Sequence, residues 1–271
     1  MINRQRVARS FHRGAACYDD LTPVQQHLIL EMVERLRLMV QPGDHLLDIG
    51  CGTGRLLQLI RTAVPTVACY GLDLAPNMIE QARKQLGGDV TLMVGDAEQL
   101  PYADASMDVV VSTSTLQWLD QLSPCFSEVA RVLKPGGRFL FSLFAQGTLQ
   151  DVKQTWRSAC SAMGVERTQD HDGTHRFHTP ETVQRSLQGA DFRDTTVTRS
   201  TQTVWYPDLI QLLMAVKQIG ANTSRPMSGK GLGWRCVFEE MAKQYQEQFG
   251  TEQGVPAQYV TVWGEGRKPV A

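Results

Sequence analysis

Short apolar runs alternate with longer helical patterns over residues 45–144. The apolar runs have the length and composition of buried strands, and they lie at 45–50, 67–74, 90–95, 107–112 and 138–144. Segments with helical spacing separate several of them, at 55–64, 76–86 and 123–133. Such alternation predicts an α/β fold in which a parallel sheet is covered by helices on both faces.

Further elements are predicted on either side of this region. Residues 24–40 place apolar side chains on one helical stripe, which a Pro-Gly pair at 42–43 ends. The stripe consists of Leu28, Met32, Leu36 and Met39. After residue 145, helical patterns lie at 149–163, 180–189, 208–219 and 234–248, and strand patterns lie at 195–206 and 258–264. We expect the chain, residues 1–271, to form a single domain.

The composition argues against several classes of protein. The 271 residues include 27 Lys and Arg against 28 Asp and Glu, so no overall positive charge favours binding to nucleic acid. No apolar stretch approaches the roughly 20 residues that a membrane span needs. Six cysteines without C-x-x-C spacing are typical of free thiols in a reducing compartment. We therefore expect a cytoplasmic protein with no nucleic-acid or membrane partner.

One strand pattern runs directly into a glycine-rich turn that opens a helix. Asp48 lies in this strand, and Gly50, Gly52 and Gly54 follow it. Such glycines let a ligand approach main-chain N–H groups at the start of a helix. The spacing departs from the dinucleotide pattern G-x-G-x-x-G, because the third glycine comes one residue early. The absence of a G-K-S/T sequence excludes a phosphate-binding P-loop.

Two further carboxylates follow the next two strand patterns. Asp73 comes about 20 residues after the glycines, where an acid can accept hydrogen bonds from both hydroxyls of a ribose. Asp96 ends the third strand pattern. Because parallel strands end at the ligand-binding edge of an open α/β sheet, these acids and Asp48 are expected to share one site. Capping of a helix or turn is the alternative role for Asp73 and Asp96.

Five motifs in order resemble those of the class I S-adenosylmethionine-dependent methyltransferases, over roughly residues 40–145. They are D-I-G-C-G-T-G, G-L-D-L-A-P-N-M, G-D-A-E-Q-L-P-Y, D-V-V-V-S-T-S-T-L-Q-W and L-K-P-G-G-R-F-L-F. The order of the whole set makes the resemblance specific, whereas a glycine loop alone would be weak. It implies S-adenosylmethionine as cofactor and a Rossmann-like, mostly parallel sheet of seven strands.

The resemblance also implies a role for each matching residue. Gly50, Gly52 and Gly54 would shape the loop under the methionine part of the cofactor, after Asp48, and Ser112 would lie near its amino group. On the nucleoside side, Asp73 would bind the ribose hydroxyls, and Asp96 would accept a hydrogen bond from the adenine amino group. The adenine would be lined by Leu74 and Ala97.

Further segments resemble a narrower family, the malonyl-carrier-protein O-methyltransferases of biotin synthesis, which methylate the free carboxyl of a malonyl thioester. They are F-H-R-G-A-A-C-Y-D with Gln26, S-T-L-Q-W, K-Q-I-G-A-N and Q-Y-V-T-V-W-G. This resemblance covers nearly the whole chain. It implies an N-terminal helical cover at 1–40, a cofactor-binding core at 41–206, a helical lid at 207–256, and a last strand and tail at 257–271.

The reaction implied by the resemblance is displacement of a methyl group from a sulfonium by a carboxylate oxygen. A carboxylic acid with a pKa of about 4 is already ionised at neutral pH, so we expect no catalytic base. No Ser/His/Asp or Cys/His arrangement is evident among the motifs. The opposite charges neutralise each other in the transition state, so exclusion of water and alignment of the reactants favour the reaction.

Four residues are candidates for binding the methyl acceptor. By the resemblance, Tyr18 would fold over the cofactor and substrate, and Gln117 and Trp118 could line the acceptor pocket. Arg225 lies in a segment, 209–238, that has four cations and no acid, and an arginine can bind a malonyl carboxylate through two hydrogen bonds. Anchoring in the core is the alternative for Tyr18 and Trp118, and a solvated basic face is the alternative for Arg225.

The expected partner is an acyl carrier protein that bears the malonyl thioester, with malonyl-coenzyme A as the alternative. Carrier proteins are acidic, and Arg6, Arg9 and Arg13 share one predicted helical face that could meet one. An ordinary polar helix face is the alternative interpretation. The basic N-terminus also resembles an organelle transit peptide, although the family resemblance accounts for it without one.

Other functions stay open at this point. A methyltransferase for another small acid or a quinone precursor is one, and a non-catalytic S-adenosylmethionine-binding module is another. The glycine spacing argues against a nicotinamide oxidoreductase. We expect no metal at His171, His175 and His178, because Gly173 and Thr174 break the helix that an i, i+4 pair of ligands would need.

Overall fold

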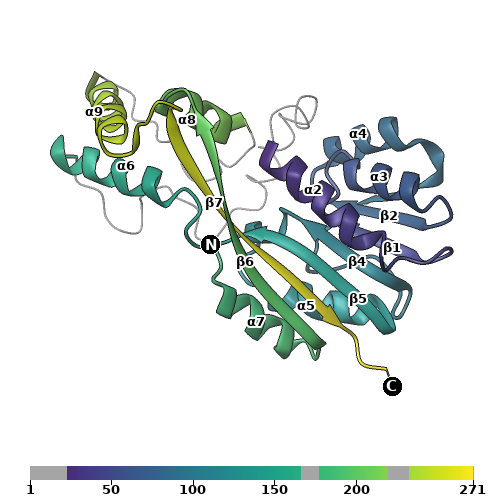
Figure 1. Cartoon of the computed structure of the whole chain (residues 1–271). Coiled ribbons are helices and arrows are strands. Elements are labelled where there is room, and N and C mark those ends of the chain that lie inside the picture. The colour runs from purple at the N-terminus through teal and green to yellow at the C-terminus, as the bar shows by residue number, and fades with distance from the viewer. Residues whose placement is uncertain (1–22, 166–176, 219–231, 271) are drawn as a thin grey trace.

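A seven-stranded sheet organises the part of the chain that the structure, a computed structural model, describes: residues 23–165, 177–218 and 232–270 (Figure 1). The strand order is β3-β2-β1-β4-β5-β7-β6. The first five strands pair in parallel, and β7 runs antiparallel to both β5 and β6. The predicted fold class, a Rossmann-like, mostly parallel sheet of seven strands, is confirmed.

The first four strands agree with their predicted ranges to within one residue. They are β1 (His45–Ile49), β2 (Ala68–Asp73), β3 (Thr91–Val94) and β4 (Met107–Thr113). Helix α3 (Arg55–Ala63) connects β1 to β2, and α4 (Pro76–Leu86) with the short η2 (Gly87–Asp89) leads into β3. Because the chain then returns to place β4 on the other side of β1, the order of strands reverses there. Open α/β sheets bind ligands at such a point, beyond the carboxyl ends of the strands.

Helices cover both faces of the sheet, as Figure 1 shows. Helices α2 (Pro23–Leu36), α3 and α4 contribute to one apolar cluster, and α5 (Ser123–Val132) and α7 (Pro180–Gly189) contribute to the other. In the second cluster Phe126 lies edge-on to Phe139, with 5.2 Å between the ring centroids. Each face of the central strands is therefore buried, which is why their sequences are almost continuously apolar.

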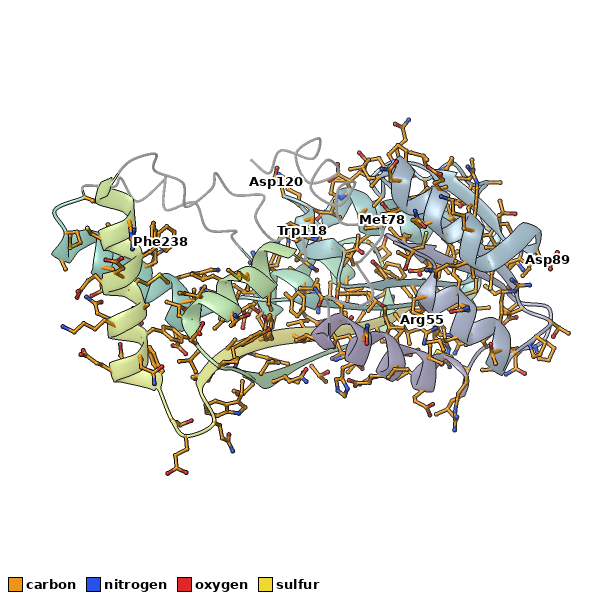
Figure 2. All side chains as sticks on the ribbon, turned by 90° about the horizontal axis from the view of Figure 1, so that it is seen from above. Arg55, Met78, Asp89, Trp118, Asp120 and Phe238 are labelled. Carbon is orange, nitrogen blue, oxygen red and sulfur yellow. The ribbon has the colours of Figure 1, made fainter. Side chains whose placement is uncertain are left out.

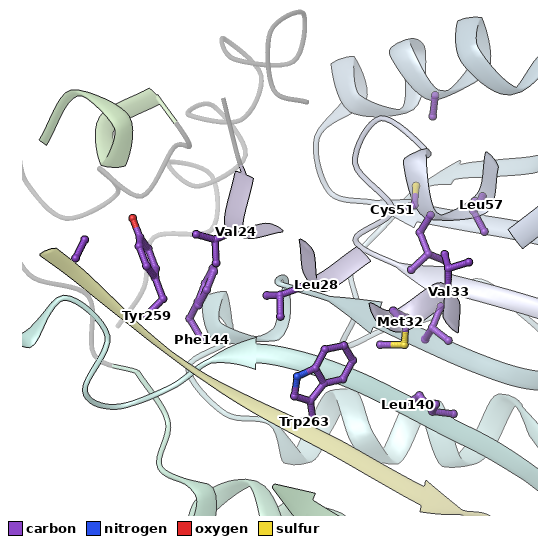
Figure 3. Close-up of a cluster of buried hydrophobic side chains, with 14 of the residues drawn as sticks. Val24, Leu28, Met32, Val33, Cys51, Leu57, Leu140, Phe144, Tyr259 and Trp263 are labelled. Carbon is purple, nitrogen blue, oxygen red and sulfur yellow. The ribbon is translucent and has the colours of Figure 1, made fainter. Parts of the chain in front are cut away.

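Helix α2 is held against the sheet by the predicted apolar stripe. Leu28, Met32 and Leu36 are buried, and Figure 3 shows Leu28 and Met32 packed above Trp263 of the last strand. The guanidinium of Arg35 lies 4.3 Å from the centre of the Trp263 ring. The helix ends at Leu36, four residues before the predicted end, because residues 37–39 turn before β1 begins.

Strand β5 (Leu133–Phe144) begins five residues earlier than predicted. A strand was expected only at 138–144, and Gly136 in the preceding K-P-G-G sequence has a positive φ of 79°, which is typical of a turn. Leu133 nevertheless pairs with Met107, and pairing resumes at Arg138 with Val109. The turn is thus an irregularity inside the strand, where Lys134 Nζ lies 2.6 Å from Asp108 Oδ2.

A group of helices packs at the far end of the long strands β6 (Arg193–Tyr206) and β7 (Val255–Arg267). These helices are α6 (Gln150–Ala162), α8 (Leu209–Gln218) and α9 (Leu232–Phe249), and we call them the helical end. Figure 1 shows α6 and α9 side by side, and the rings of Trp156 and Phe238 are 5.3 Å apart. Helix α6, which falls in the predicted core range 41–206, therefore packs with the predicted lid.

The insertion at 207–256 does lie between β6 and β7 in the chain, and its role as a lid stays a prediction. None of the helices among the described residues is long and apolar enough to cross a membrane.

Candidate active site

The glycine loop joins β1 to α3 at the carboxyl edge of the sheet. Gly50 has a φ of 73°, and a Cβ atom placed on it would lie 2.2 Å from the side chain of Thr115. Gly52 has a φ of 54° and has open space where a Cβ would be. A Cβ on Gly54 would lie 2.6 Å from Leu86 of α4. The loop is therefore packed on two sides and open at Gly52.

The Asp73 carboxylate joins the end of β2 to this loop. Its Oδ2 accepts a hydrogen bond from Gly52 N at 3.0 Å, and its Oδ1 accepts one from Ala75 N at 2.8 Å. Burial raises the pKa of Asp73, and the hydrogen bonds from Ala75 and Gly52 oppose that change. The carboxylate thus caps a turn, as the alternative interpretation held, and at the same time fixes the glycine loop.

Asp48 lies beneath the loop and is 3% exposed. Burial and the neighbouring carboxylate of Asp73 raise its pKa to about 8, so the ligand-free protein carries a proton on Asp48 at neutral pH. Asp96 plays a more local role, since its Oδ1 accepts a hydrogen bond from Glu98 N at 3.0 Å. The three predicted acids do share one edge of the sheet.

A pocket opens at this edge. Of the predicted cofactor residues and acceptor residues, those lining it are Asp48, Gly50, Gly52, Asp73, Leu74, Asp96, Ala97 and Trp118. Figure 2 shows Arg55, Met78 and Trp118, which also line it, in the half of the molecule away from Phe238 of α9. No residue of α8 or α9 is among the described residues of the lining. The described part of the insertion therefore does not form a wall of this pocket.

The turn after β4 forms another wall. Thr113, Ser114 and Thr115 line the pocket with Trp118 and Leu119, and the short helix η3 (Leu116–Trp118) follows the hydroxyl residues. The hydroxyl of Thr115 lies 3.3 Å from the Gly50 carbonyl oxygen and 3.2 Å from that of Thr113. This wall is thereby joined directly to the glycine loop.

The segment before α7 also contacts this wall. The ring Nε2 of His178 lies 2.8 Å from the carbonyl oxygen of Leu119, and Gln146 N donates to the His178 carbonyl at 3.0 Å. The described histidine of the H-D-G-T-H-R-F-H segment thus contacts the backbone of the pocket wall. No group of three potential metal ligands occurs among the residues described.

Three predicted site residues lie elsewhere. Ser112 is fully buried, does not line the pocket, and donates from Oγ to the Ile49 carbonyl at 2.8 Å. Gln117 is also buried away from the lining, and its Nε2 donates to the Ser114 carbonyl at 2.7 Å. Gly54 packs on α4 and is not part of the lining. Successive side chains of a strand point to opposite faces. The side chain of Ser112 therefore points into the interior, whereas the next residue, Thr113, lines the pocket.

Several predicted residues lie outside the described residues, or have side chains that do. These are Tyr18, Arg225, Lys230, His171, His175, Arg6, Arg9, Arg13 and the side chain of Lys217. Of the cations in 209–238, Arg235 is described, and its Nε lies 2.9 Å from Glu239 Oε1 on the exposed face of α9. The proposed role of Arg225 thus stays a prediction.

Sequence reasoning missed the contribution of α2. Gln25 is 7% exposed and lines the pocket together with Ile29, whereas Gln26, part of the family motif, is exposed. Gln25 and Ile29 are four residues apart, so they share a face of the helix. The sequence signal for this contribution was Gln25, a polar residue next to the apolar stripe and one turn before Ile29. Arg55, the first residue of α3, lines the same pocket.

Similarity to known proteins decides the family. Residues 47–141 match the model of the methyltransferase domain family. A malonyl-acyl carrier protein O-methyltransferase from Geobacter sulfurreducens is 40% identical over 270 residues, which are 99% of this chain and 100% of the relative. The chain belongs to the malonyl-acyl carrier protein O-methyltransferase family.

Other relatives and structures agree with this membership. A biotin biosynthesis bifunctional protein BioHC from Teredinibacter turnerae is 28% identical over 98% of this chain and 47% of its own length. The crystal structure of the YcgJ protein from Bacillus subtilis is similar with a TM-score of 0.60, 17% identity, and coverage of 91% of this chain and 100% of that one. The structural likeness supports the fold.

The enzyme is therefore an S-adenosylmethionine-dependent O-methyltransferase. The lining residues fit that cofactor. Leu74 is 39% exposed although it is apolar, and it lines the pocket together with the carboxyl residues Asp73 and Asp96. A flat apolar surface beside hydrogen-bond acceptors suits an adenosine, and the open side of Gly52 leaves room for a ligand on the loop.

Proposed function

We propose that this enzyme transfers the methyl group of S-adenosylmethionine to the free carboxyl of a malonyl thioester carried on acyl carrier protein. The supporting observation is the 40% identity over both full lengths to a relative named for that reaction. The product is the methyl ester of the malonyl group. Related bifunctional proteins are named for biotin biosynthesis, which supports the same pathway for this chain.

The lining of the pocket suits an acceptor that needs no activation. A carboxylic acid with a pKa of about 4 is ionised at neutral pH, and S-adenosylmethionine supplies a methyl group already activated by its sulfonium. The described lining contains no His or Lys, and its carboxyl residues, Asp48, Asp73 and Asp96, are assigned to the cofactor. The protein's contribution is then to align the two reactants and to exclude water from their opposite charges.

Individual residues are assigned on this proposal. Asp73 receives the ribose hydroxyls, and Leu74 and Ala97 contact the adenine beside Asp96. Gly50 and Gly52 bring the loop backbone against the methionine part. Trp118 lies on the acceptor side of the pocket. Tyr18 and Arg225 are proposed to cover the acceptor and to bind its carboxylate, respectively.

A panel of acceptors tests the proposal. Methyl transfer from labelled cofactor is measured with malonyl-acyl carrier protein, malonyl-coenzyme A, acetyl-acyl carrier protein and the methyl ester of malonyl-acyl carrier protein, and mass spectrometry locates the added methyl group. We expect transfer to malonyl thioesters, with the carrier protein preferred, and none to the other two. Cofactor binding without transfer to any acid would instead indicate a binding module.

A further inference from the structure

Two hydroxyl groups in the wall of the pocket have no hydrogen-bond partner within the described structure. They are Thr113 Oγ1 and Ser114 Oγ, and both atoms are buried. The next residue differs, because the Thr115 hydroxyl lies within reach of two carbonyl oxygens. A buried polar group without a partner is unfavourable, and native proteins rarely leave one unless a water or ligand completes it. These two hydroxyls are therefore available to a water or to a ligand group on this side of the pocket.

The backbone of Ser114 is held in place on both sides. Its φ is 54°, a left-handed conformation that is uncommon for serine. Ser114 N donates to the Ser142 carbonyl at 2.9 Å, and the Ser114 carbonyl accepts from Gln117 Nε2 at 2.7 Å. Such conformations persist where the surrounding structure determines them, and they cluster at ligand sites. The buried Gln117 thus supports the turn, although it does not line the pocket.

The position of the two hydroxyls distinguishes them from the nucleoside side. Asp73, Leu74 and Asp96 lie at the ends of β2 and β3, whereas Thr113 and Ser114 lie at the end of β4, on the other side of β1. Thr115 packs against Gly50 of the glycine loop, so the hydroxyl residues lie beside the part of the loop assigned to the methionine group. Trp118 and Leu119 of the same wall add apolar surface.

We propose that Thr113 and Ser114 donate hydrogen bonds to the carboxylate of the methyl acceptor and thereby select an ionised acid. This inference rests on the proposed function. One carboxylate oxygen accepts the two hydrogen bonds, and the other oxygen forms the new bond to the methyl carbon while the sulfur–methyl bond breaks. No proton is transferred, and the sulfonium and carboxylate charges are both neutralised. Hydrogen bonds to an ionised acceptor are stronger than those between neutral groups, so the two hydroxyls suit an ionised acid.

The test compares three variants that each remove one or two hydroxyl groups. Thr113→Val and Ser114→Ala, alone and combined, keep similar side-chain volume and remove the proposed donors. Ser142→Ala is the matched control. Its hydroxyl is also buried without a described partner, and Ser142 pairs with Thr113 across β4 and β5, but it does not line the pocket.

Two quantities are measured for each variant: kcat/KM with malonyl-acyl carrier protein, and the affinity for S-adenosylhomocysteine by calorimetry. For the double variant we expect kcat/KM to fall by roughly 10- to 100-fold, mainly through a higher KM, since hydrogen bonds to charged groups have this strength. Affinity for S-adenosylhomocysteine should stay within about threefold of wild type, and Ser142→Ala should match wild type in both assays.

Three outcomes would overturn the inference. In the first, the double variant keeps the wild-type kcat/KM while the wild-type enzyme methylates malonyl-acyl carrier protein, and the proposed function then stands. In the second, the variants lose affinity for S-adenosylhomocysteine in proportion to kcat/KM, which would place the hydroxyls on the cofactor. In the third, wild-type protein methylates no malonyl thioester, which refutes the proposed function as well.

Discussion

The cofactor half of the molecule, residues 45–119, and the helical end are held together by different interactions. In the cofactor half, loop amides donate hydrogen bonds to acceptors on β2, as Gly52 N does to Asp73 and Gly50 N does to the Leu72 carbonyl at 2.7 Å. The helical end depends on ring packing between helices, such as Trp156 of α6 against Phe238 of α9 with 5.3 Å between centroids. Directional bonds at fixed backbone angles tolerate little change, whereas apolar packing can adjust.

This difference predicts which substitutions should alter ligand binding and which should alter only stability. A change in the cofactor half should alter affinity for the cofactor, because the same groups that fix the loop also line the pocket. A change in the helical end should alter stability alone, because its described residues do not line the pocket. Gly50→Ala, Asp73→Asn and Tyr245→Phe test this separation, in order of decreasing expected effect on cofactor affinity, and a pH dependence of stability is expected from Asp48.

Gly50→Ala should have the largest effect. The new Cβ would lie 2.2 Å from the Thr115 side chain at a φ of 73°, so both the loop and the wall must shift. We expect at least a roughly 100-fold loss of affinity for S-adenosylhomocysteine and a destabilisation of about 2–3 kcal/mol. Calorimetry and thermal unfolding measure these.

Gly52→Ala is the matched control, since its Cβ would meet no atom within 4 Å although its φ is also positive. It should destabilise the protein by only about 1 kcal/mol. Equal destabilisation by the two substitutions would show that backbone angle, and not contact with Thr115, determines the need for glycine.

Asp73→Asn should weaken cofactor binding by roughly 10- to 100-fold. Asparagine has one acceptor oxygen, so it cannot accept hydrogen bonds from Gly52 N, Ala75 N and the ribose hydroxyls together. Titration with S-adenosylhomocysteine measures the loss. Asp89→Asn removes an exposed acid from the same half and should bind normally. If Asp73→Asn also binds normally, the carboxylate is only a turn cap.

Asp48 should make the stability of the ligand-free enzyme depend on pH. Its pKa of about 8 in the folded protein exceeds the ordinary value of 3.8, so the folded state holds a proton that the unfolded state releases. The free energy of unfolding should therefore fall as pH rises from about 4 to 8, by at most about 1.4 kcal/mol per unit.

Urea unfolding at several pH values, with wild type and Asp48→Asn, measures this dependence. Asp48→Asn should lack the decrease in the free energy of unfolding that Asp48 causes between about pH 4 and 8. Its free energy of unfolding should exceed that of wild type by the largest amount near pH 8. Parallel pH curves for the two proteins would contradict a buried, protonated Asp48.

Tyr245→Phe should have the smallest effect and should be confined to stability. It removes the hydroxyl that donates to the Pro256 carbonyl at 2.7 Å and leaves the ring in place. We expect a loss of about 1–2 kcal/mol in the free energy of unfolding. Affinity for S-adenosylhomocysteine should stay within twofold of wild type. A larger change in affinity would reveal coupling between the helical end and the cofactor half.

The strands of the cofactor half were predicted from the sequence more accurately than the last strand. Strands β1 to β4 were predicted to within one residue, because each is a short apolar run bounded by turn residues. Strand β7 was predicted at 258–264 and extends over Val255–Arg267, since β6 pairs with it along nearly all of that length. Pro256 would ordinarily argue against a strand, but here it lies opposite Trp205 within the pair.

The family motifs contain several residues that line the pocket, whereas other lining residues are determined by packing. The acids Asp48, Asp73 and Asp96 follow from their spacing after strands. Ser112 was wrong by one position, because only the register of β4 against its neighbours decides which hydroxyls reach the pocket. Gln25 was missed because α2 lies far from the motifs in sequence.

What the amino-acid sequence determined by itself was local: the order of strands and helices, the glycines with left-handed backbone, and the family. These depend on neighbouring residues, whose steric limits and apolar spacing are written directly in the chain. Only the tertiary structure decided which side chains meet. Burial of Asp48 beside Asp73, the contact of Thr115 with Gly50, and the two hydroxyls without partners all arise from elements distant in sequence, and desolvation acts only after those elements pack.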